Sequence, residues 1–508
     1  MRTLGVLLNG DRANTAGRVL LAGLLSRKGQ FQKASEELAA AEADYEKTGN
    51  QEGLCDVLLA RSGTQPKQSV EKSRQDARRV LVLSGKTGNR YHHLMAKFRL
   101  AATEQADGHF DKAMLLAHEA AGQAEREGML ALAALAMGDF GYGFLSQRRY
   151  EPAAEALLDA VKMAERSKSY SVLATSRLRL GEALTALHRA DEAIAVMRPA
   201  VEWFRQGGHD SSLPHVLIKW GTSVAAHDPR EAERSFLEAL RAAEQIGDEM
   251  YLSMALQRLG SFYWLRDLRK AAEYNERARH FIRKVRNTGV FFQAASAAIA
   301  SGHFQKAEDW IAEGERQIAE YPEILNRVFL TESAHTARAM LLYSRGHCAA
   351  ALQESAQARN KDNLLAAGVS YQVQLRRMKV CASPQEAARH LIWIEERRRA
   401  DPRMPDALSA SLAIAAGEFA LRTGKWEDAK RSAERGPAAS RKLGFRVPEL
   451  QNLLVLRAAE IRLGNREQGL AITQQVMHLA PETGIGTPPD WAGCYDLKLL
   501  WKLAAEPR

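Results

Sequence analysis

The stretch MGDFGYGFLSQRRYEPAAEALLDAVKMAER, Met137–Arg166, decides the fold of this chain. Apolar or small residues recur in it at helical spacing, first at Met137, Phe140, Gly141 and Phe144, and then at Tyr150, Ala153, Leu157 and Ala160. The spacing predicts two helices joined by a tight turn, with the small residues Gly141 and Ala153 where the helix faces meet. Because neither helix can bury its apolar face alone, we expect the unit to be repeated along the chain.

The same order of residue types does return along most of the sequence. The turn phrase recurs as GHFDKA at 108–113, GHFQKA at 302–307 and GKWEDA at 424–429. An alanine of the second helix recurs mostly every 36 to 44 residues, at Ala34, Ala113, Ala153, Ala193, Ala232, Ala271, Ala307, Ala351, Ala387 and Ala429. Ala77 marks one weaker unit, and Gly469 takes the alanine position of the last one. These markers predict roughly twelve hairpins between about residues 12 and 481.

This pattern resembles the tetratricopeptide repeat (TPR) over nearly the whole chain. The period is longer than the common form and is similar to that of kinesin light chains, of the sensor arms of large bacterial transcription activators, and of the repeats that follow some bacterial Ser/Thr kinases. The resemblance implies an all-α fold, a right-handed superhelical solenoid of helix-turn-helix repeats. The pattern is weakest at Gln51–Ser84 and Lys361–Arg399, where the turn glycine is missing.

The repeats also predict how the helices end and how the chain is divided. Three helices are expected to end at a glycine, at the centre of Thr48–Asn50, Thr87–Asn89 and Ile246–Asp248. Glycine readily adopts the left-handed backbone conformation that ends a helix, and the Asn or Asp that follows can cap the next helix. We expect an N-terminal tail at 1–11, tandem repeats at 12–481, a linker loop at 482–490 and a capping helix at 491–508. Pro481 is the expected helix stop. The cap would cover the open core end with Trp491, Leu497, Leu500, Trp501 and Leu503.

Composition gives a first view of compartment. Hydrophobic residues make up 46% and charged residues 26% of the chain, and no window is apolar enough to span a membrane. The N-terminal apolar run is too short for a secretory signal. The cysteines Cys55, Cys348, Cys381 and Cys494 lie far apart in sequence and form no CxxC pair. We therefore predict a cytoplasmic protein with reduced thiols, in which Cys348 packs in the place of a turn aromatic.

The charge pattern leaves two interpretations open. The net charge is +10, and basic runs occur at Arg277–Arg286 and Glu396–Arg403. Both runs are expected on the convex side, where a solvated face is the simpler interpretation. Binding of nucleic acid or of an acidic partner is the less favoured one. Stacking aromatics do not interleave these runs in an order that suggests single-strand binding.

Motifs of catalysis and cofactor binding are absent from the sequence. It contains no GxxxxGK[ST], HExxH or GxSxG motif. Asp139–Gly141 spells the kinase DFG triplet but falls inside a predicted helix, and His92 and His93 point apart on a helix. We predict a chain without enzymatic activity, metal or cofactor.

The TPR resemblance implies that first helices line a concave groove and that the residues beside the small Gly or Ala face inward. Carried over residue by residue, the predicted partner-binding set is Phe98, Tyr142, Glu182, Thr185, Thr222, Gln257, Ser261, Trp264 and Phe292, together with Glu418. The alternative is that rings such as Phe98 merely pack between repeats. The Lys and Asn with which chaperone-tail-binding TPRs hold a terminal carboxylate are missing around Tyr142 and Glu182. These features favour a scaffold that binds a protein or peptide. The alternative is a sensor or regulatory arm of a bacterial signalling protein whose effector domain is absent.

Overall fold

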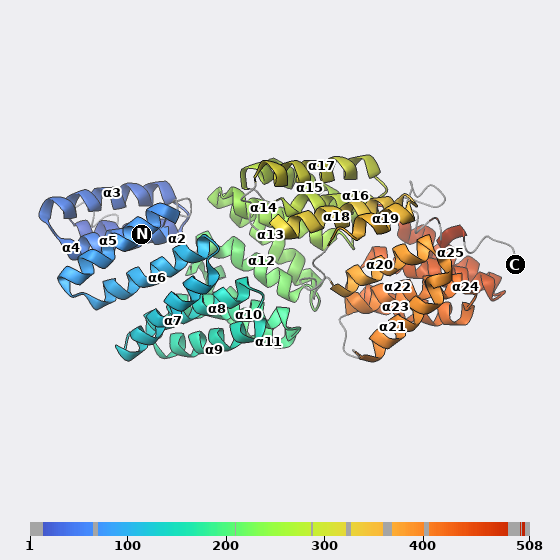
Figure 1. The fold of residues 1–508 in the computed structure, drawn as a ribbon, viewed down its shortest axis with the longest axis horizontal. Coiled ribbons are helices and arrows are strands. Elements are labelled where there is room, and N and C mark those ends of the chain that lie inside the picture. The colour runs from blue at the N-terminus through green and yellow to red at the C-terminus, as the bar shows by residue number, and fades with distance from the viewer. Residues whose placement is uncertain are drawn as a thin grey trace. The chain divides into compact units, whose positions relative to one another are not determined.

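The structure, a computed structural model, is made of helical hairpins. It describes residues 14–64, 70–208, 210–285, 288–321, 327–358, 368–400, 406–485, 498 and 500–502, and every regular element within these ranges is helical. Helices α2 to α25 pair in chain order into twelve hairpins (Figure 1). The prediction of an all-α helical-repeat solenoid is therefore confirmed.

Each hairpin has a first and a second helix. The first helices are α2 (Thr15–Arg27), α4 (Gln51–Thr64), α6 (Arg90–Ala106), α8 (Leu130–Ser146), α10 (Tyr170–Ala186), α12 (Leu213–Val224), α14 (Glu249–Tyr263), α16 (Gly289–Ala300), α18 (Arg327–Ser344), α20 (Gly368–Ala382), α22 (Asp406–Arg422) and α24 (Arg446–Arg462). The second helices are α3 (Phe31–Thr48), α5 (Val70–Thr87), α7 (Phe110–Arg126), α9 (Tyr150–Arg166), α11 (Ala190–Trp203), α13 (Pro229–Ile246), α15 (Leu268–Val285), α17 (Phe304–Glu320), α19 (Cys348–Ser355), α21 (Ala387–Ala400), α23 (Trp426–Lys442) and α25 (Arg466–Thr483). The short elements η1 (Phe204–Gly208) and η2 (Asp210–Ser212) follow α11, and η3 (Pro384–Glu386) precedes α21.

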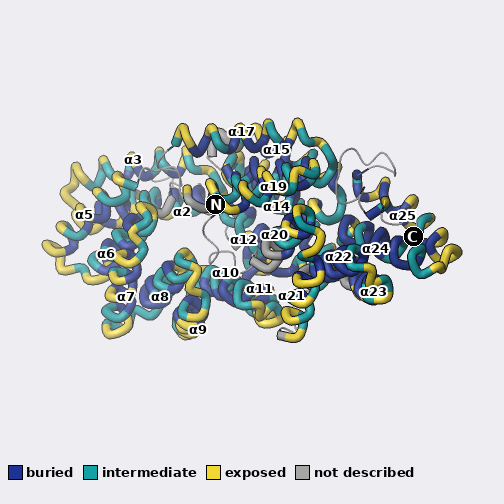
Figure 2. Tube along the Cα trace, turned by 45° about the vertical axis from the view of Figure 1, so that its right-hand side comes forward, coloured by how far each residue is buried: buried dark blue, intermediate teal, exposed yellow. Residues whose placement is uncertain are grey.

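The chain divides into two compact units. Unit 1 comprises residues 1–224 and 238–247, and unit 2 comprises residues 225–237 and 248–508. Helix α13 contributes to both units. In each unit the buried residues lie on the helix faces that meet other helices, while exposed residues follow the opposite faces (Figure 2).

Small residues let the two helices of a hairpin approach closely, as the sequence predicts. Ala153 is fully buried in a core cluster with Leu157. A Cβ atom on Gly141 would lie 2.6 Å from Cγ of Leu157, so a larger residue there would force the helices apart. The Gly181 position has the same relation to Met197, whose Cγ would lie 2.0 Å from an added Cβ. Close backbone approach is thus a recurring requirement of the fold.

The predicted helix ends are also present. Gly49 has a φ of 71°, in the left-handed region that favours glycine. The side chain of Asn89 accepts a hydrogen bond from the backbone N–H of His92 at 3.1 Å. Asp248 accepts from the backbone N–H of Met250 at 2.9 Å. These caps satisfy N–H groups that a helix start leaves without partners.

The two weakest repeats of the sequence form hairpins as well. The unit at Gln51–Ser84 contains α4 and α5, and the unit at Lys361–Arg399 contains α20 and α21. In the second of these, the short element η3 stands in place of the glycine turn and begins with Pro384. Hairpin formation therefore survives the loss of the turn glycine.

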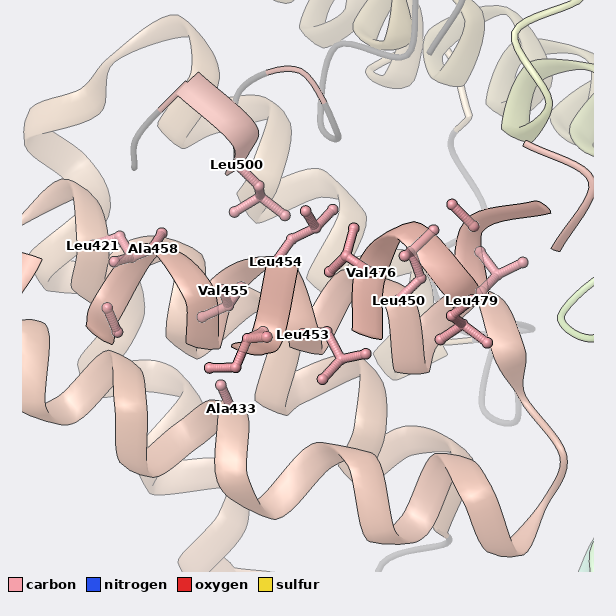
Figure 3. Packing of buried hydrophobic residues seen from close by; sticks show 14 of the residues in the cluster. Leu421, Ala433, Leu450, Leu453, Leu454, Val455, Ala458, Val476, Leu479 and Leu500 are labelled. Carbon is pink, nitrogen blue, oxygen red and sulfur yellow. The ribbon is translucent and has the colours of Figure 1, made fainter. Parts of the chain in front are cut away.

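The end of the last repeat differs in one detail from the prediction. Helix α25 continues past Pro481 to Thr483 and ends at Gly484, which has a φ of 80°. Leu500 is fully buried against the core of α22–α25 (Figure 3). Trp501 is partly buried and packs against the same cluster. Most of the predicted linker and cap, 486–497, 499 and 503–508, lies outside the described residues, as does the predicted tail.

The cysteine prediction needs a correction. Cys348 at the start of α19 and Cys381 near the end of α20 form a disulfide, with Cα atoms 5.7 Å apart. The pair could not be recognised from the sequence because the two cysteines are far apart in it. The packing of consecutive hairpins places the end of α20 next to the turn between α18 and α19. Cys55 is free and buried, and burial, with Asp56 and Glu52 nearby, raises its thiol pKa to about 11. Cys494 lies outside the described residues.

Candidate functional site

The first helices of unit 1 bring equivalent residues of successive repeats into one row. Helices α6, α8, α10 and α12 each contact the next one directly. At a spacing of 40 residues they carry Arg99, Asp139, Arg179 and Lys219, and three residues further on α8 and α10 carry Tyr142 and Glu182. We call these six side chains the charged row.

Arg179 connects two helices at the centre of the charged row. Its Nη1 donates a hydrogen bond to Oδ1 of Asp139 at 2.5 Å, which ties α10 to α8. The same guanidinium lies 4.7 Å from the ring centroid of Tyr142, a cation–π distance. The ring of Tyr142 remains 38% exposed. Arg179 therefore holds one face of the Tyr142 ring in place, while the exposed part of the ring stays accessible to a partner.

A second ion pair continues the row toward α12. Lys219 Nζ donates to Oε2 of Glu182 at 2.7 Å, and both side chains remain partly exposed. Thr185 Oγ1 lies 2.9 Å from Oγ of Ser223, so α10 and α12 are also joined through hydroxyl groups. The row is thus built from side chains that the packing of neighbouring repeats already orients.

The electrostatic environment of the row is slightly positive. Three cations, Arg99, Arg179 and Lys219, face two carboxylates. Burial, followed by the charges of Lys219 and Arg179, lowers the pKa of His215 on α12 to about 4. Burial also lowers the pKa of Arg99, an effect that the charge of Asp139 opposes. His215 is therefore neutral at pH 7 and adds no charge.

The structure corrects the prediction for Phe98. Its side chain is 3% exposed and belongs to the core cluster that also contains Leu94 and Met95. The reason is register, because Phe98 precedes Arg99 by one residue and so points about 100° away on the helix. The other predicted residues of unit 1, Thr185 and Thr222, donate to backbone carbonyls of their own helices at 2.7 and 2.8 Å.

In unit 2 the predicted residues divide in the same way. Trp264, directly after α14, is 39% exposed. Ser261 donates to the backbone oxygen of Gln257 at 3.0 Å and accepts from the amide of Gln293. Phe292 is 4% exposed, and its ring fills the space beside Gly314, so the prediction of an accessible ring is wrong there.

Glu418 is also not an inward-facing surface residue. It is fully buried, and it accepts hydrogen bonds from Arg377 at 2.9 Å and from Arg422 at 3.2 Å. Two guanidiniums compensate the charge of this carboxylate, which the sequence pattern alone could not reveal. The arrangement is a structural contact between α20 and α22.

The described parts of the basic runs are engaged in local contacts. Arg279 pairs with Glu276 at 3.4 Å and lies over the ring of Trp310, and Arg398 pairs with Glu395 at 2.8 Å. The side chains at 282–287 and 400–408 lie outside the described residues.

Metal-ligating clusters and membrane-spanning helices are two further features that bear on the type of site. Among the described residues, no three His, Cys, Asp or Glu side chains gather in a way that could hold a metal ion. The adjacent His92 and His93 separate, and His92 Nε2 lies 2.9 Å from Oδ1 of Asp56. None of the described helices combines the length and the apolar character that a membrane crossing needs.

The sequence reasoning missed Arg99, Arg179 and Lys219. Their signal was present, because all three share one position of the 40-residue repeat. The inward positions predicted from the repeat are those beside the small Gly or Ala. Of the charged row, these positions include only Tyr142 and Glu182.

Comparison with known proteins gave matches among solved structures. No family model and no curated protein matches the sequence. The chain is similar to a signal transduction ATPase with numerous domains and a tetratricopeptide repeat sensor, from Pyrococcus horikoshii, with 17% identity and a TM-score of 0.44 over 68% of this chain and 54% of that one. The chain thus spans about half of that protein's length.

Two other solved structures are similar over most of their length. One is a Rap protein complexed with competence and sporulation factor, with 15% identity and a TM-score of 0.38 over 72% of this chain and 97% of that one. The other is yeast Tom70, with 14% identity and a TM-score of 0.37 over 91% of this chain and 98% of that one. The hairpins and the repeat pattern define this chain as a TPR-like helical-repeat protein.

Proposed function

We propose that this chain is a non-catalytic module that binds a segment of a partner protein along the charged row of unit 1. The observation that carries the proposal is the partly exposed ring of Tyr142 beside Arg179, with the Lys219–Glu182 pair joining α12 to α10 next to them. An exposed aromatic ring among oriented polar groups is the usual composition of an interaction hot spot.

Pre-organisation supports the same proposal. The side chains of Arg179, Glu182 and Lys219 are 23%, 22% and 29% exposed, and each bonds to a neighbouring first helix. Side chains that are already ordered lose little further conformational entropy when a partner binds. An extended or helical segment could then use the tyrosine as its apolar contact and the flanking charges for orientation.

The alternative that the sequence left open, a sensor or regulatory arm of a larger signalling protein, would use the same face. Both functions require capture of a protein or peptide, and neither requires chemistry on the chain. Retention of partners on the immobilised chain therefore tests both functions.

The proposal is tested by retention of partners on the immobilised full chain. Tyr142→Ala should lose proteins that the wild-type chain retains, and a photocrosslinker at position 142 should label the same proteins. Tyr170→Ala is the matched control, since Tyr170 is 64% exposed at the start of α10 in the same unit. Unchanged retention by Tyr142→Ala, together with equal labelling from positions 142 and 170, would contradict the proposal.

A further inference from the structure

A hollow of about 590 Å³ lies in unit 2 between the end of α23, the start of α24 and α25. Its volume falls within the range of small-molecule sites. Leu453 and Leu479, both labelled in Figure 3, provide apolar walls and are almost fully buried. Most of the other lining residues are polar or charged, so the hollow combines a small apolar surface with groups that can orient a ligand.

Two arginines meet at one side of the hollow on a single buried carboxylate. Arg441 Nε donates to Oε1 of Glu449 at 2.6 Å, and Arg446 Nη1 donates to Oε2 at 3.1 Å. The Glu449 side chain is 6% exposed, whereas those of Arg441 and Arg446 are 57% and 47% exposed. Glu449 therefore uses both oxygens to hold two guanidiniums at the surface of the hollow, and it compensates only one of their charges.

Both guanidiniums keep donors available. Arg441 bonds to Glu449 through Nε alone, and no hydrogen-bond partner of its two Nη groups occurs in the part of the chain that the structure describes. The amides of Gln474 and Gln475, on the α25 side, likewise have no hydrogen-bond partner among the described residues. Donors thus line the hollow from both sides.

The end of the hollow beside Arg446 also carries a carboxylate, that of Glu482. Glu482 lies 3.8 Å from Arg446 Nε and 3.6 Å from Nδ1 of His478, and its side chain is 44% exposed. A ligand with several negative groups would therefore meet repulsion at this end. The charge pattern suits one anionic group at the arginines and a neutral or cationic remainder toward Glu482.

We propose that this hollow is a binding site for a small molecule with one carboxylate or phosphate group. The anionic group accepts hydrogen bonds from the two Nη groups of Arg441 and from Nη2 of Arg446, because planar guanidinium groups match the geometry of such oxygens. The carbon part of the ligand lies against Leu453 and Leu479. The site is independent of the charged row, which belongs to unit 1.

The proposal is tested by calorimetric titration of the full chain with inorganic phosphate, glycerol 3-phosphate and hexanoate, with hexanol as the uncharged control. We expect saturable binding of at least one anionic probe and none of hexanol. A preference for glycerol 3-phosphate over phosphate would assign a phosphate ester, and a preference for hexanoate would assign a carboxylate. Absence of saturable binding by all three anions would overturn the proposal.

Variants then locate the binding. Arg441→Gln and Gln474→Glu should each weaken it at least tenfold. Gln474 is exposed, so its replacement leaves the core untouched and adds a negative charge where the ligand would lie. Arg431→Gln on α23 changes the net charge by the same amount at an exposed position outside the hollow, and it should bind as the wild type does. Equal affinity of the Gln474→Glu and Arg431→Gln variants would place the anion elsewhere and overturn the proposal.

Discussion

The guanidinium of Arg266 lies 4.7 Å from the ring centroid of Phe445, which joins two turns of unit 2 that are far apart in sequence. The same guanidinium lies 3.9 Å from the ring centroid of Phe262. Arg266 also donates to the backbone oxygens of Phe262 at 2.7 Å and Leu443 at 2.8 Å. The turn after α14 is thereby fixed to the turn before α24, although repeat proteins are held mainly by contacts between neighbouring repeats.

Replacement of Arg266 by alanine should therefore destabilise unit 2. The variant loses two hydrogen bonds and two ring contacts, for which we expect a loss of roughly 2–4 kcal/mol in the free energy of unfolding. Denaturant titration followed by circular dichroism measures this change. Arg269→Ala is the control, because Arg269 is 71% exposed and, within the described part of the chain, its side chain makes polar contacts only with the oxygen of Pro481 at 3.2 Å and with Asp267 at the surface. An equal loss in both variants would show that the stacked guanidinium has no special role.

Close helix approach at Ala153 gives a second prediction. Ala153→Leu adds bulk at a fully buried position of α9, and we expect a loss of roughly 1–3 kcal/mol in stability from overpacking. Ala131→Leu on α8 is the matched control, because Ala131 is exposed. Thermal unfolding of both variants tests the assignment of buried and exposed positions on α8 and α9. A larger loss of stability from Ala131→Leu than from Ala153→Leu would contradict this assignment.

Local pattern was enough to predict the hairpins, since the small residue at Gly141 and the capping residue at Asn89 have their effects within one repeat. The surface was predicted less well. A shift of one position decides whether Phe98 or Arg99 takes the place in the charged row, and that shift depends on the exact rotation of α6 against its neighbours.

Contacts between distant segments could not be predicted at all. Cys348 and Cys381 pair across two neighbouring hairpins, whereas the contact of Arg266 with Phe445 depends on how far several successive hairpins rotate. Each repeat adds a small rotation that no local motif encodes, and the sum over several repeats decides which turns meet.

The disulfide between Cys348 and Cys381 predicts a dependence of stability on reducing agent. The bond closes a loop of 33 residues, and in the chain-entropy account its reduction should lower the free energy of unfolding by roughly 3–4 kcal/mol. Denaturant titrations with and without dithiothreitol measure the difference. The Cys348→Ser/Cys381→Ser double variant should unfold like the reduced protein and be insensitive to the reagent. A persistent effect of dithiothreitol on that variant would mean that another group is responsible.

His215 predicts a dependence on pH. Its pKa in the folded chain is lowered from 6.5 to about 4, so between these values the unfolded state binds more protons than the folded state. The stability that neutral His215 provides is complete above pH 6.5 and is lost as the pH falls toward 4, with a total of up to about 3 kcal/mol. His215→Gln should flatten this part of the pH profile of unfolding. A profile that is as steep in the variant would show that other groups cause the acid sensitivity.

The predicted aromatic contacts of the two units can be compared separately. Tyr142 in unit 1 and Trp264 in unit 2 are both partly exposed, at 38% and 39%, while Phe98 and Phe292 are buried. If partners bind first-helix surfaces, the Tyr142→Ala/Trp264→Ala double variant should weaken capture by about 2 kcal/mol or more, because aromatic side chains carry much of the energy of such interfaces.

The single variants show which unit contributes, and melting temperatures confirm that each variant is folded. Arg316→Ala is the control on a second helix, since Arg316 is 71% exposed on α17 and pairs with Glu313 alone among the described residues. Capture that survives the double aromatic variant but is lost with Arg316→Ala would move the binding surface to the second helices. The basic runs, with nucleic acid or acidic proteins as ligands, would then be the next surfaces to test.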